Sequence, residues 1–230
     1  MTDRPPPPPS SPASAAYPPP PWHTHGRAWA QPFLVDARAL DLPPGFRPVT
    51  LAGRAIGVLA LIEYVAPSPL TYAELTWMPC LVSARAAGRT VRGYFVDTMY
   101  VDSAASLAGG RELWALPKVL ARFAIGAREA TIDTADGAHL VLELGAIRGP
   151  AIPLRGAGGT VQDAGTELVR FRGAGSARVA PGSLRIREVR GTEAWRGFAT
   201  ARRLPGLGVA LTSFEVAMLP PQRLPREAPP

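Results

Sequence analysis

The sequence predicts a mainly β protein, largely antiparallel and built as a barrel or a sandwich. Between the two ends of the chain, short apolar runs rich in Val, Ile, Phe, Tyr and Thr alternate with Gly and Pro. Turn signals such as AAGRT, DGAH and GAGGT separate several of these runs at hairpin spacing. The hydrophobic fraction of 47% in 230 residues is sufficient for one packed core, and an all-β barrel of this length commonly forms a single domain.

The apolar runs give the expected strands in chain order. They are IGVLALIEYV, ELTWMPCLVSA, GYFVDTMYV, RFAIGA, ATIDTA, HLVLELGAI, ELVRFRG, SLRIREV and FEVAML. Helices are few. The best candidate covers Ser103 to Trp114, with Asp102 or Ser103 as its cap and Pro117 as its stop. A second short helix is expected over Thr192 to Arg203.

Composition divides the chain into one domain and two tails. Residues 1–22 are dominated by Pro, Ala and Ser, which cannot bury enough apolar area to fold, so we expect a disordered proline-rich arm. Residues 23–221 form the predicted domain. Residues 222–230 are again rich in proline and are expected to form a disordered tail.

Charge and apolar patterning restrict the classes of partner. The formal charge of +7 would suit a nucleic acid, but the arginines are scattered singly and no nucleic-acid-binding motif is present, so no such partner is expected. No stretch approaches the length of a membrane-spanning helix, and no secretory signal is present, which predicts a soluble cytoplasmic protein without a membrane partner. Cys80 lies in an apolar run and is expected to be a small core residue.

One residue departs from the composition of the whole chain. Of 25 basic residues only Lys118 is a lysine, and it stands in the stretch GGRELWALPKVLARF. A guanidinium makes the better ion pair, whereas only an amine can lose its proton and act as a nucleophile. A free lysine, with a pKa of about 10.4, is almost fully protonated at neutral pH, so a nucleophilic amine requires burial. The apolar neighbours of Lys118 fit that requirement, and they equally fit a lysine whose stem covers apolar surface.

At these residues the chain resembles the acetoacetate decarboxylase family. The family signature is a Gly-Arg-Glu run followed within a turn by Pro-Lys, here Gly110 to Glu112 and then Pro117 and Lys118. The stretches LIEYVAPSPLTYAEL and GYFVDTMYVDSAASLAGG extend the similarity, which covers roughly residues 22–221. The resemblance implies an antiparallel β-barrel or curved sheet and a homo-oligomer. It also implies Schiff-base chemistry at the lysine, with a small keto acid as substrate.

The resemblance also assigns roles to other residues. Glu74, and with less support Glu63, would handle protons, and Arg27 in the HGR run would bind the substrate carboxylate. Tyr72 and Trp114 would wall the pocket. The archetype of the family has a second lysine after the first, where this chain has Val119.

The implied reaction is decarboxylation of a β-keto acid without a cofactor, because the protonated imine accepts the electrons that the departing carbon dioxide leaves behind. The three histidines have no metal-ligand spacing, so no metal is expected. Two alternatives stay open. The same imine can support aldolase or dehydratase chemistry on pyruvate-type keto acids, and a decayed site would leave a barrel that binds a small molecule without turning it over.

Overall fold

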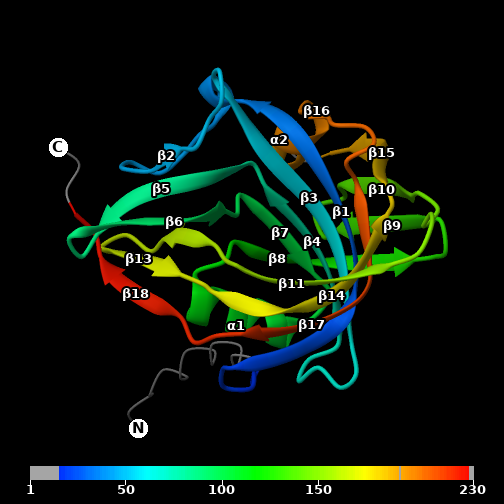
Figure 1. Cartoon of the computed structure of the whole chain (residues 1–230), viewed down its shortest axis with the longest axis horizontal. Coiled ribbons are helices and arrows are strands. Elements are labelled where there is room, and N and C mark those ends of the chain that lie inside the picture. The colour runs from blue at the N-terminus through cyan, green and yellow to red at the C-terminus, as the bar shows by residue number, and fades with distance from the viewer. Residues whose placement is uncertain (1–15, 192, 228–230) are drawn as a thin grey trace, which may run out of the picture.

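The computed structural model describes residues 16–191 and 193–227, which form a strongly curved, open β-sheet with two smaller sheets beside it (Figure 1). The large sheet has 12 strands. Its order is β11 (Ile152–Gly158), β14 (Gly173–Pro181), β17 (Val209–Met218), β1 (Trp22–Asp36), β3 (Arg54–Val65), β4 (Tyr72–Met78), β7 (Thr98–Val101), β8 (Lys118–Ile125), β9 (Glu129–Thr134), β10 (His139–Leu144) and β15 (Leu184–Arg190), with β16 (Arg202–Arg203) beside β1. The two ends of this order do not pair with each other, so the prediction of a curved sheet is confirmed.

The two smaller sheets have three strands each. One joins β12 (Val161–Asp163), β13 (Glu167–Arg170) and β18 (Gln222–Pro225), and the other joins β2 (Arg47–Pro48), β5 (Cys80–Ala86) and β6 (Arg89–Phe95). The helical elements are α1 (Ala104–Trp114), α2 (Arg196–Ala199) and the 3-10 turns η1 (Ala37–Ala39) and η2 (Glu193–Trp195). None of the helices in the described part of the chain is long and apolar enough to cross a membrane.

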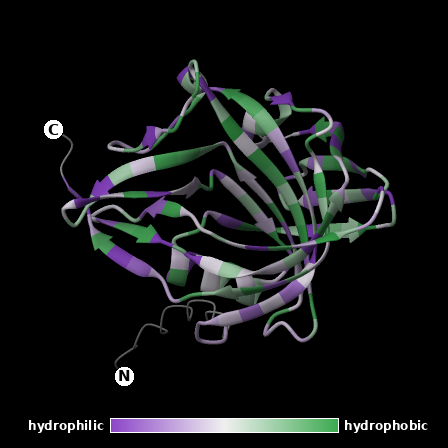
Figure 2. Cartoon of the chain, viewed as in Figure 1, coloured by the Kyte–Doolittle hydropathy of each residue, from purple (hydrophilic) through white to green (hydrophobic). Residues whose placement is uncertain are grey.

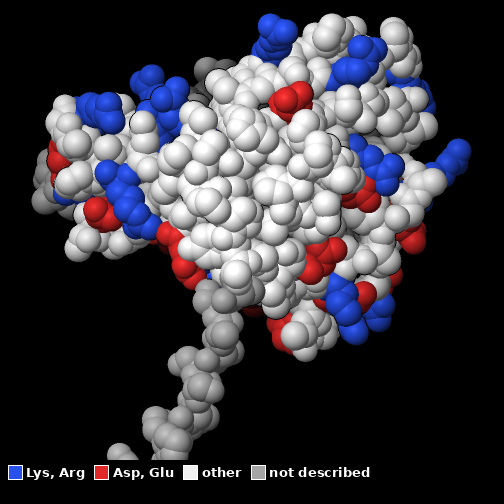
Figure 3. Space-filling view, turned by 90° about the horizontal axis from the view of Figure 1, so that it is seen from below, with Lys and Arg blue, Asp and Glu red and all other residues white. Residues whose placement is uncertain are grey.

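Both faces of the centre of the large sheet are covered. Along β4, Leu75 and Trp77 enter the main core, while Glu74 and Thr76 point to the opposite face. Six of the seven β4 residues are therefore buried, although their polarity alternates with the period of two that a strand requires. Figure 2 shows the same alternation of hydrophobic and hydrophilic residues on several strands. The face of the molecule in Figure 3 is largely uncharged at its centre, with arginines and acidic residues interspersed around it.

The helix expected over Ser103 to Trp114 is confirmed. Ser103 caps it, because its side chain accepts a hydrogen bond from the backbone N–H of Ser106. The second helix is shorter than the predicted range of Thr192 to Arg203. It ends at Ala199, and Arg202 and Arg203 pair with β1 as a short strand instead.

Within the described residues, parts of both predicted tails pack against the domain. Residues 1–15, most of the predicted arm, lie outside the described residues. Tyr17 and Trp22 pack against α1, and the Tyr17 hydroxyl donates a hydrogen bond to Glu112 over 2.6 Å. The prediction of a disordered tail from residue 222 is wrong through residue 226, because β18 pairs with β13 and Arg226 forms an ion pair with Asp163.

Cys80 is fully buried, which confirms its place in the core. Burial raises the pKa of its thiol to about 12. Compared with a free thiol, the thiolate fraction at about pH 8 falls roughly a thousandfold, so we expect native protein to resist iodoacetamide. Mass spectrometry of native and guanidinium-unfolded samples checks this, because the unfolded chain must react. Rapid alkylation of the native protein would show that Cys80 is accessible.

Candidate active site

A parallel crossover places Lys118. Strand β7 leads into helix α1, and the chain returns as β8, which pairs in parallel with β7. A helical crossover is the usual connection between parallel neighbours, and β7 with β8 is the parallel pair in an otherwise antiparallel main sheet. Lys118 is the first residue of β8 and lies opposite Met99.

The turn between α1 and β8 is fixed by the backbone. Ala115 adopts the left-handed conformation with φ of 53°, and its N–H and that of Leu116 bond to carbonyls of the last helical turn. The Arg111 side chain donates a hydrogen bond from Nε to the carbonyl of Lys118 over 2.8 Å. The signature arginine therefore anchors the backbone of the lysine.

The Lys118 side chain is 1% exposed and all its polar contacts are internal. Nζ lies 2.9 Å from Glu74 Oε2 and donates a second hydrogen bond to Ser106 Oγ over 2.8 Å. It also lies 5.1 Å from the centre of the Tyr72 ring. The structure thus places two predicted residues, Glu74 and Tyr72, around the Lys118 amine, together with Ser106, which was not predicted.

Helix α1 makes room for this amine. A Cβ at Gly110 would lie 2.5 Å from Cδ and Cε of Lys118, so a side chain at this position would occupy the space of the lysine. Ser106 and Gly110 are one helical turn apart and therefore share a face. The helix turns its small residues toward Lys118, and the signature glycine is required by this close approach.

Two stacked tyrosines close the site beside Glu74. The rings of Tyr64 and Tyr72 are 4.4 Å apart, and the Tyr72 hydroxyl donates a weak hydrogen bond to Glu74 Oε2 over 3.4 Å. Burial, and then the Glu74 carboxylate, raise the pKa of both phenols well above its usual value. Both tyrosines are therefore neutral hydrogen-bond donors at physiological pH.

Lys118 and Glu74 stand at the wall of a cavity of about 250 Å³. Most of the lining is apolar and includes Phe171, Phe214 and three of the four methionines of the chain, Met78, Met99 and Met218. Within the lining, Lys118 and Glu74 are the charged residues, and they pair with each other.

Three threonine hydroxyls also border the cavity. Thr24 Oγ1 already donates to the carbonyl of Val216 over 3.0 Å. The hydroxyls of Thr76 and Thr160 are buried and have no hydrogen-bond partner among the described residues. Buried polar groups are rarely left unpaired, so these two hydroxyls are available to a ligand.

Four of the predicted site residues do not line this cavity: Arg27, Glu63, Trp114 and Tyr72, the last of which borders a neighbouring hollow instead. Arg27 forms an ion pair with Glu63 on the neighbouring strand, and Arg27 is half exposed. The pair borders a separate open hollow of about 450 Å³, which shares Tyr64 with the cavity. Trp114 does not line the cavity either. It packs edge-on against Trp22 and Phe171, and its Nε1 donates to the carbonyl of Leu219.

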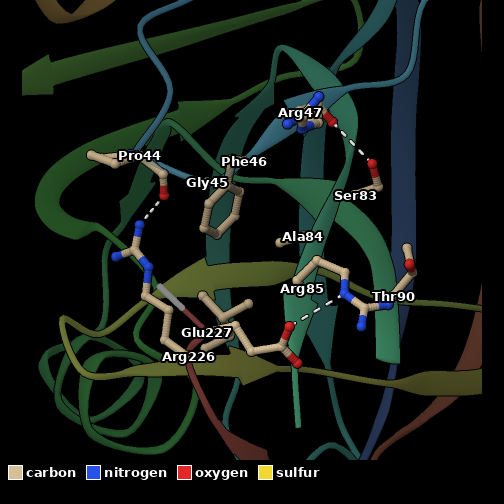
Figure 4. A pocket seen from close by; sticks show the side chains of 11 residues that line it. Pro44, Gly45, Phe46, Arg47, Ser83, Ala84, Arg85, Thr90, Arg226 and Glu227 are labelled. Carbon is tan, nitrogen blue, oxygen red and sulfur yellow. Dashed lines mark hydrogen bonds and ion pairs between the residues drawn. The ribbon is translucent and has the colours of Figure 1, made fainter. Parts of the chain in front are cut away.

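A larger hollow, of about 610 Å³, lies elsewhere and is shown in Figure 4. Two of its arginines are engaged, because Arg85 pairs with Glu227 and Arg226 donates to the carbonyl of Pro44. It contains no buried nucleophile comparable with Lys118. Among residues 16–191 and 193–227, no group of three His, Cys, Asp or Glu side chains is placed to hold a metal ion.

Sequence reasoning missed Ser106, Tyr64 and Thr76. Ser106 could have been found from its helical spacing to Gly110, and Thr76 from its spacing of two residues to Glu74 on a strand. Tyr64 reaches the site through the pairing of β3 with β4, which no local pattern reveals.

The candidate site is therefore a buried amine that pairs with a carboxylate. It lies at the wall of an apolar cavity on a curved β-sheet. The sequence model of the family "Acetoacetate decarboxylase (ADC)" matches residues 4–216. The chain therefore belongs to the acetoacetate decarboxylase family, a family of enzymes. A search of curated proteins gives no significant match.

Solved structures share the fold. An acetoacetate decarboxylase-like enzyme from Sphingomonas wittichii RW1 is 19% identical with a TM-score of 0.59, over 89% of this chain and 92% of that one. The enduracididine biosynthesis enzyme MppR, complexed with the condensation product of pyruvate and imidazole 4-carboxaldehyde, is 19% identical with a TM-score of 0.53, over 94% of both chains. The acetoacetate decarboxylase of Legionella pneumophila is 18% identical with a TM-score of 0.51, over 95% of this chain and 90% of that one.

The position of Gly110 gives a testable consequence. In Gly110→Ala the new methyl group displaces the Lys118 stem and moves the amine from Glu74 and Ser106. We expect reductive alkylation of Lys118 by a small ketone and cyanoborohydride to slow on the order of a hundredfold, because small misplacements of a reacting group have effects of that size. Lys118 is the only lysine, so peptide mass spectrometry measures this directly.

Gly156→Ala is the matched control, since nothing lies within 4 Å of a Cβ at that position. Thermal unfolding of both variants verifies that they fold. An undiminished rate in Gly110→Ala would mean that the position of the amine is not set by this contact.

Proposed function

We propose that the protein is a Schiff-base-forming lyase that decarboxylates a small β-keto acid. The observation that carries this proposal is the Lys118 amine, held within 2.9 Å of a buried carboxylate beside an apolar cavity. The site combines a nucleophile, a proton acceptor in direct contact and walls that exclude water.

Glu74 is the group that prepares the amine for attack. Its side chain is 6% exposed and that of Lys118 is 1% exposed, so burial penalises the charge on both. Transfer of one proton from Nζ to Oε2 removes both charges and leaves a neutral amine with a lone pair. The carboxylic acid that forms can then return the proton to oxygen during imine formation.

The steps follow from these positions. The neutral amine adds to the ketone carbon, Glu74 protonates the oxygen, and water leaves to give the iminium ion. The bond to the carboxylate carbon breaks, carbon dioxide departs, and its electron pair forms the enamine. Protonation of the enamine carbon and hydrolysis by water release the ketone and restore Lys118.

The lining favours decarboxylation over reactions that keep the carboxylate. Lys118 is the only cation in the lining, and Arg27 is paired with Glu63 outside it. When a β-keto acid is decarboxylated, the electron pair of its carboxylate neutralises the iminium ion and neutral carbon dioxide leaves, so an apolar wall favours the reaction. Until then the Thr76 hydroxyl can donate to the carboxylate. A pyruvate-type substrate keeps its carboxylate throughout and would find no cation for it in this cavity other than the iminium ion itself.

Aldolase or dehydratase chemistry is the second candidate, and its support is the likeness to MppR, whose structure holds a pyruvate condensation product. Both reactions would use the same imine. A binding protein without turnover is the third. We also propose a keto acid as the physiological ligand and a homo-oligomer as the assembly, as in the family resemblance.

Borohydride reduction separates these functions. With acetoacetate, we expect a reduced adduct on the Lys118 peptide that has lost the carboxylate, because carbon dioxide leaves before reduction. With pyruvate, an aldolase or dehydratase would give an adduct that keeps it. Mass spectrometry of the peptide distinguishes the two, and absence of any adduct would exclude imine chemistry. The double variant Lys118→Met with Glu74→Gln is the control, since it removes both buried charges and avoids leaving one unpaired.

Replacement of the proton acceptor tests the role of Glu74. In Glu74→Gln we expect kcat for carbon dioxide release to fall by about 10²–10⁴, the usual contribution of acid–base catalysis. Glu63→Gln should lose far less, because Glu63 lies outside the cavity, and the exposed Glu215→Gln serves as a matched control. Comparable losses in Glu74→Gln and Glu63→Gln would contradict the assignment. Circular dichroism confirms folding of each variant.

A further inference from the structure

The cavity is polar at one side and apolar at the other. Lys118 lies on β8, and Glu74 and the unpartnered hydroxyl of Thr76 lie on β4, with only β7 between these two strands. Thr76 pairs with Met99, and Met99 pairs with Lys118, so the three form one row across the sheet. The polar groups that can receive a keto acid are therefore close together.

The opposite wall belongs to a distant part of the sheet. Leu211, Phe214 and Val216 line the cavity from β17, which is separated from β8 by β1, β3, β4 and β7. The large sheet is strongly curved (Figure 1), and this apolar wall of β17 lines the same cavity as Lys118 of β8. The hydroxyl of Thr24, which lies opposite Val216, already donates to the carbonyl of that residue.

The cavity volume exceeds what the smallest β-keto acid fills. An apolar cavity of about 150 Å³ accommodates benzene, with its six carbon atoms. By proportion, about 250 Å³ accommodates on the order of ten non-hydrogen atoms. Acetoacetate has fewer, and its only apolar group is one methyl. A small substrate would leave the β17 wall without contacts, and such contacts contribute to binding.

The methionines make the cavity adaptable. Met78, Met99 and Met218 line the cavity, and unbranched thioether side chains adjust to ligands of different shape. A site for a single small, charged molecule would instead require fixed polar groups around it.

We infer that the substrate is a β-keto acid with an apolar chain several carbons longer than that of acetoacetate, which lies along Leu211, Phe214 and Val216 of β17. This inference rests on the proposed function for its chemistry. The specificity of the site is then set by apolar contact at the end remote from Lys118.

Two series of compounds test the inference. In the first, kcat/KM for carbon dioxide release is measured for acetoacetate, 3-oxohexanoate and 3-oxooctanoate. We expect it to rise about fourfold for each methylene up to the length that fills the cavity. In the second, dissociation constants of acetone, 2-pentanone and 2-heptanone are measured by calorimetry, with a parallel decrease expected. Because the ketones require no decarboxylation, this series measures the contribution of the apolar wall to binding. It does so even if no keto acid is turned over and the proposed function fails.

Variants of Val216 locate the effect. Val216→Phe fills the wall and should lower kcat/KM for 3-oxooctanoate at least tenfold more than for acetoacetate, whereas Val216→Ala should shift the preference toward longer chains. Ser213→Phe adds a ring on the same strand outside the cavity lining and should keep the wild-type preference. Because the two Val216 variants change volume in opposite directions, misfolding of one leaves the other decisive. Equal affinity for short and long ketones, or an unchanged preference in a folded Val216 variant, would overturn the inference.

Discussion

The buried pair of Lys118 and Glu74 is the interaction on which the arrangement of the site depends. Burial of two charges is tolerated only where each finds its partner and further hydrogen bonds, and loss of one partner typically costs about 3–5 kcal/mol. Here the amine has Glu74, Ser106 and the Tyr72 ring around it. Strand β4, helix α1 and strand β8 must therefore meet at one point, and the parallel crossover from β7 to β8 brings them there.

The residue after the lysine has no part in this pair. The archetype of the family has a second lysine where this chain has Val119, but side chains of consecutive strand residues point to opposite faces. Val119 is 43% exposed, while Lys118 is buried. A cation at position 119 would face away from the cavity as well. The chemistry of Lys118 in this chain is consequently set by burial and by Glu74.

The sequence predicted the parts of the site that have local signals. The lone lysine after Pro117 and the capped helix before it could each be recognised from their neighbours, whereas Glu74 was predicted through the family resemblance. Strand β1 was not predicted, since Pro32 and Gly26 interrupt its pattern, and yet it pairs with both β3 and β17 at the centre of the sheet. Val216 reaches the cavity only through that long-range pairing, and Tyr64 reaches it through the pairing of β3 with β4. The C-terminal strand β18 was missed for a similar reason: its proline-rich composition suggests disorder, and pairing with β13 overrides it.

The separation of Arg27 from the cavity shows how strand register determines the charge of the site. On β1, Thr24 and Ala28 line the cavity, whereas Arg27 pairs with Glu63 on the other side. The register shifts between Gly26 and Ala28, and a Cβ at Gly26 would lie 2.0 Å from the carbonyl oxygen of Glu63, so the backbones are in close contact there. Turning Arg27 inward would require a slip of one residue, which would also turn the apolar neighbours outward. The geometry of β1 thus keeps the cavity lining free of a second cation, and in the proposed reaction a carboxylate that enters it is stabilised by hydroxyl groups and the iminium ion alone.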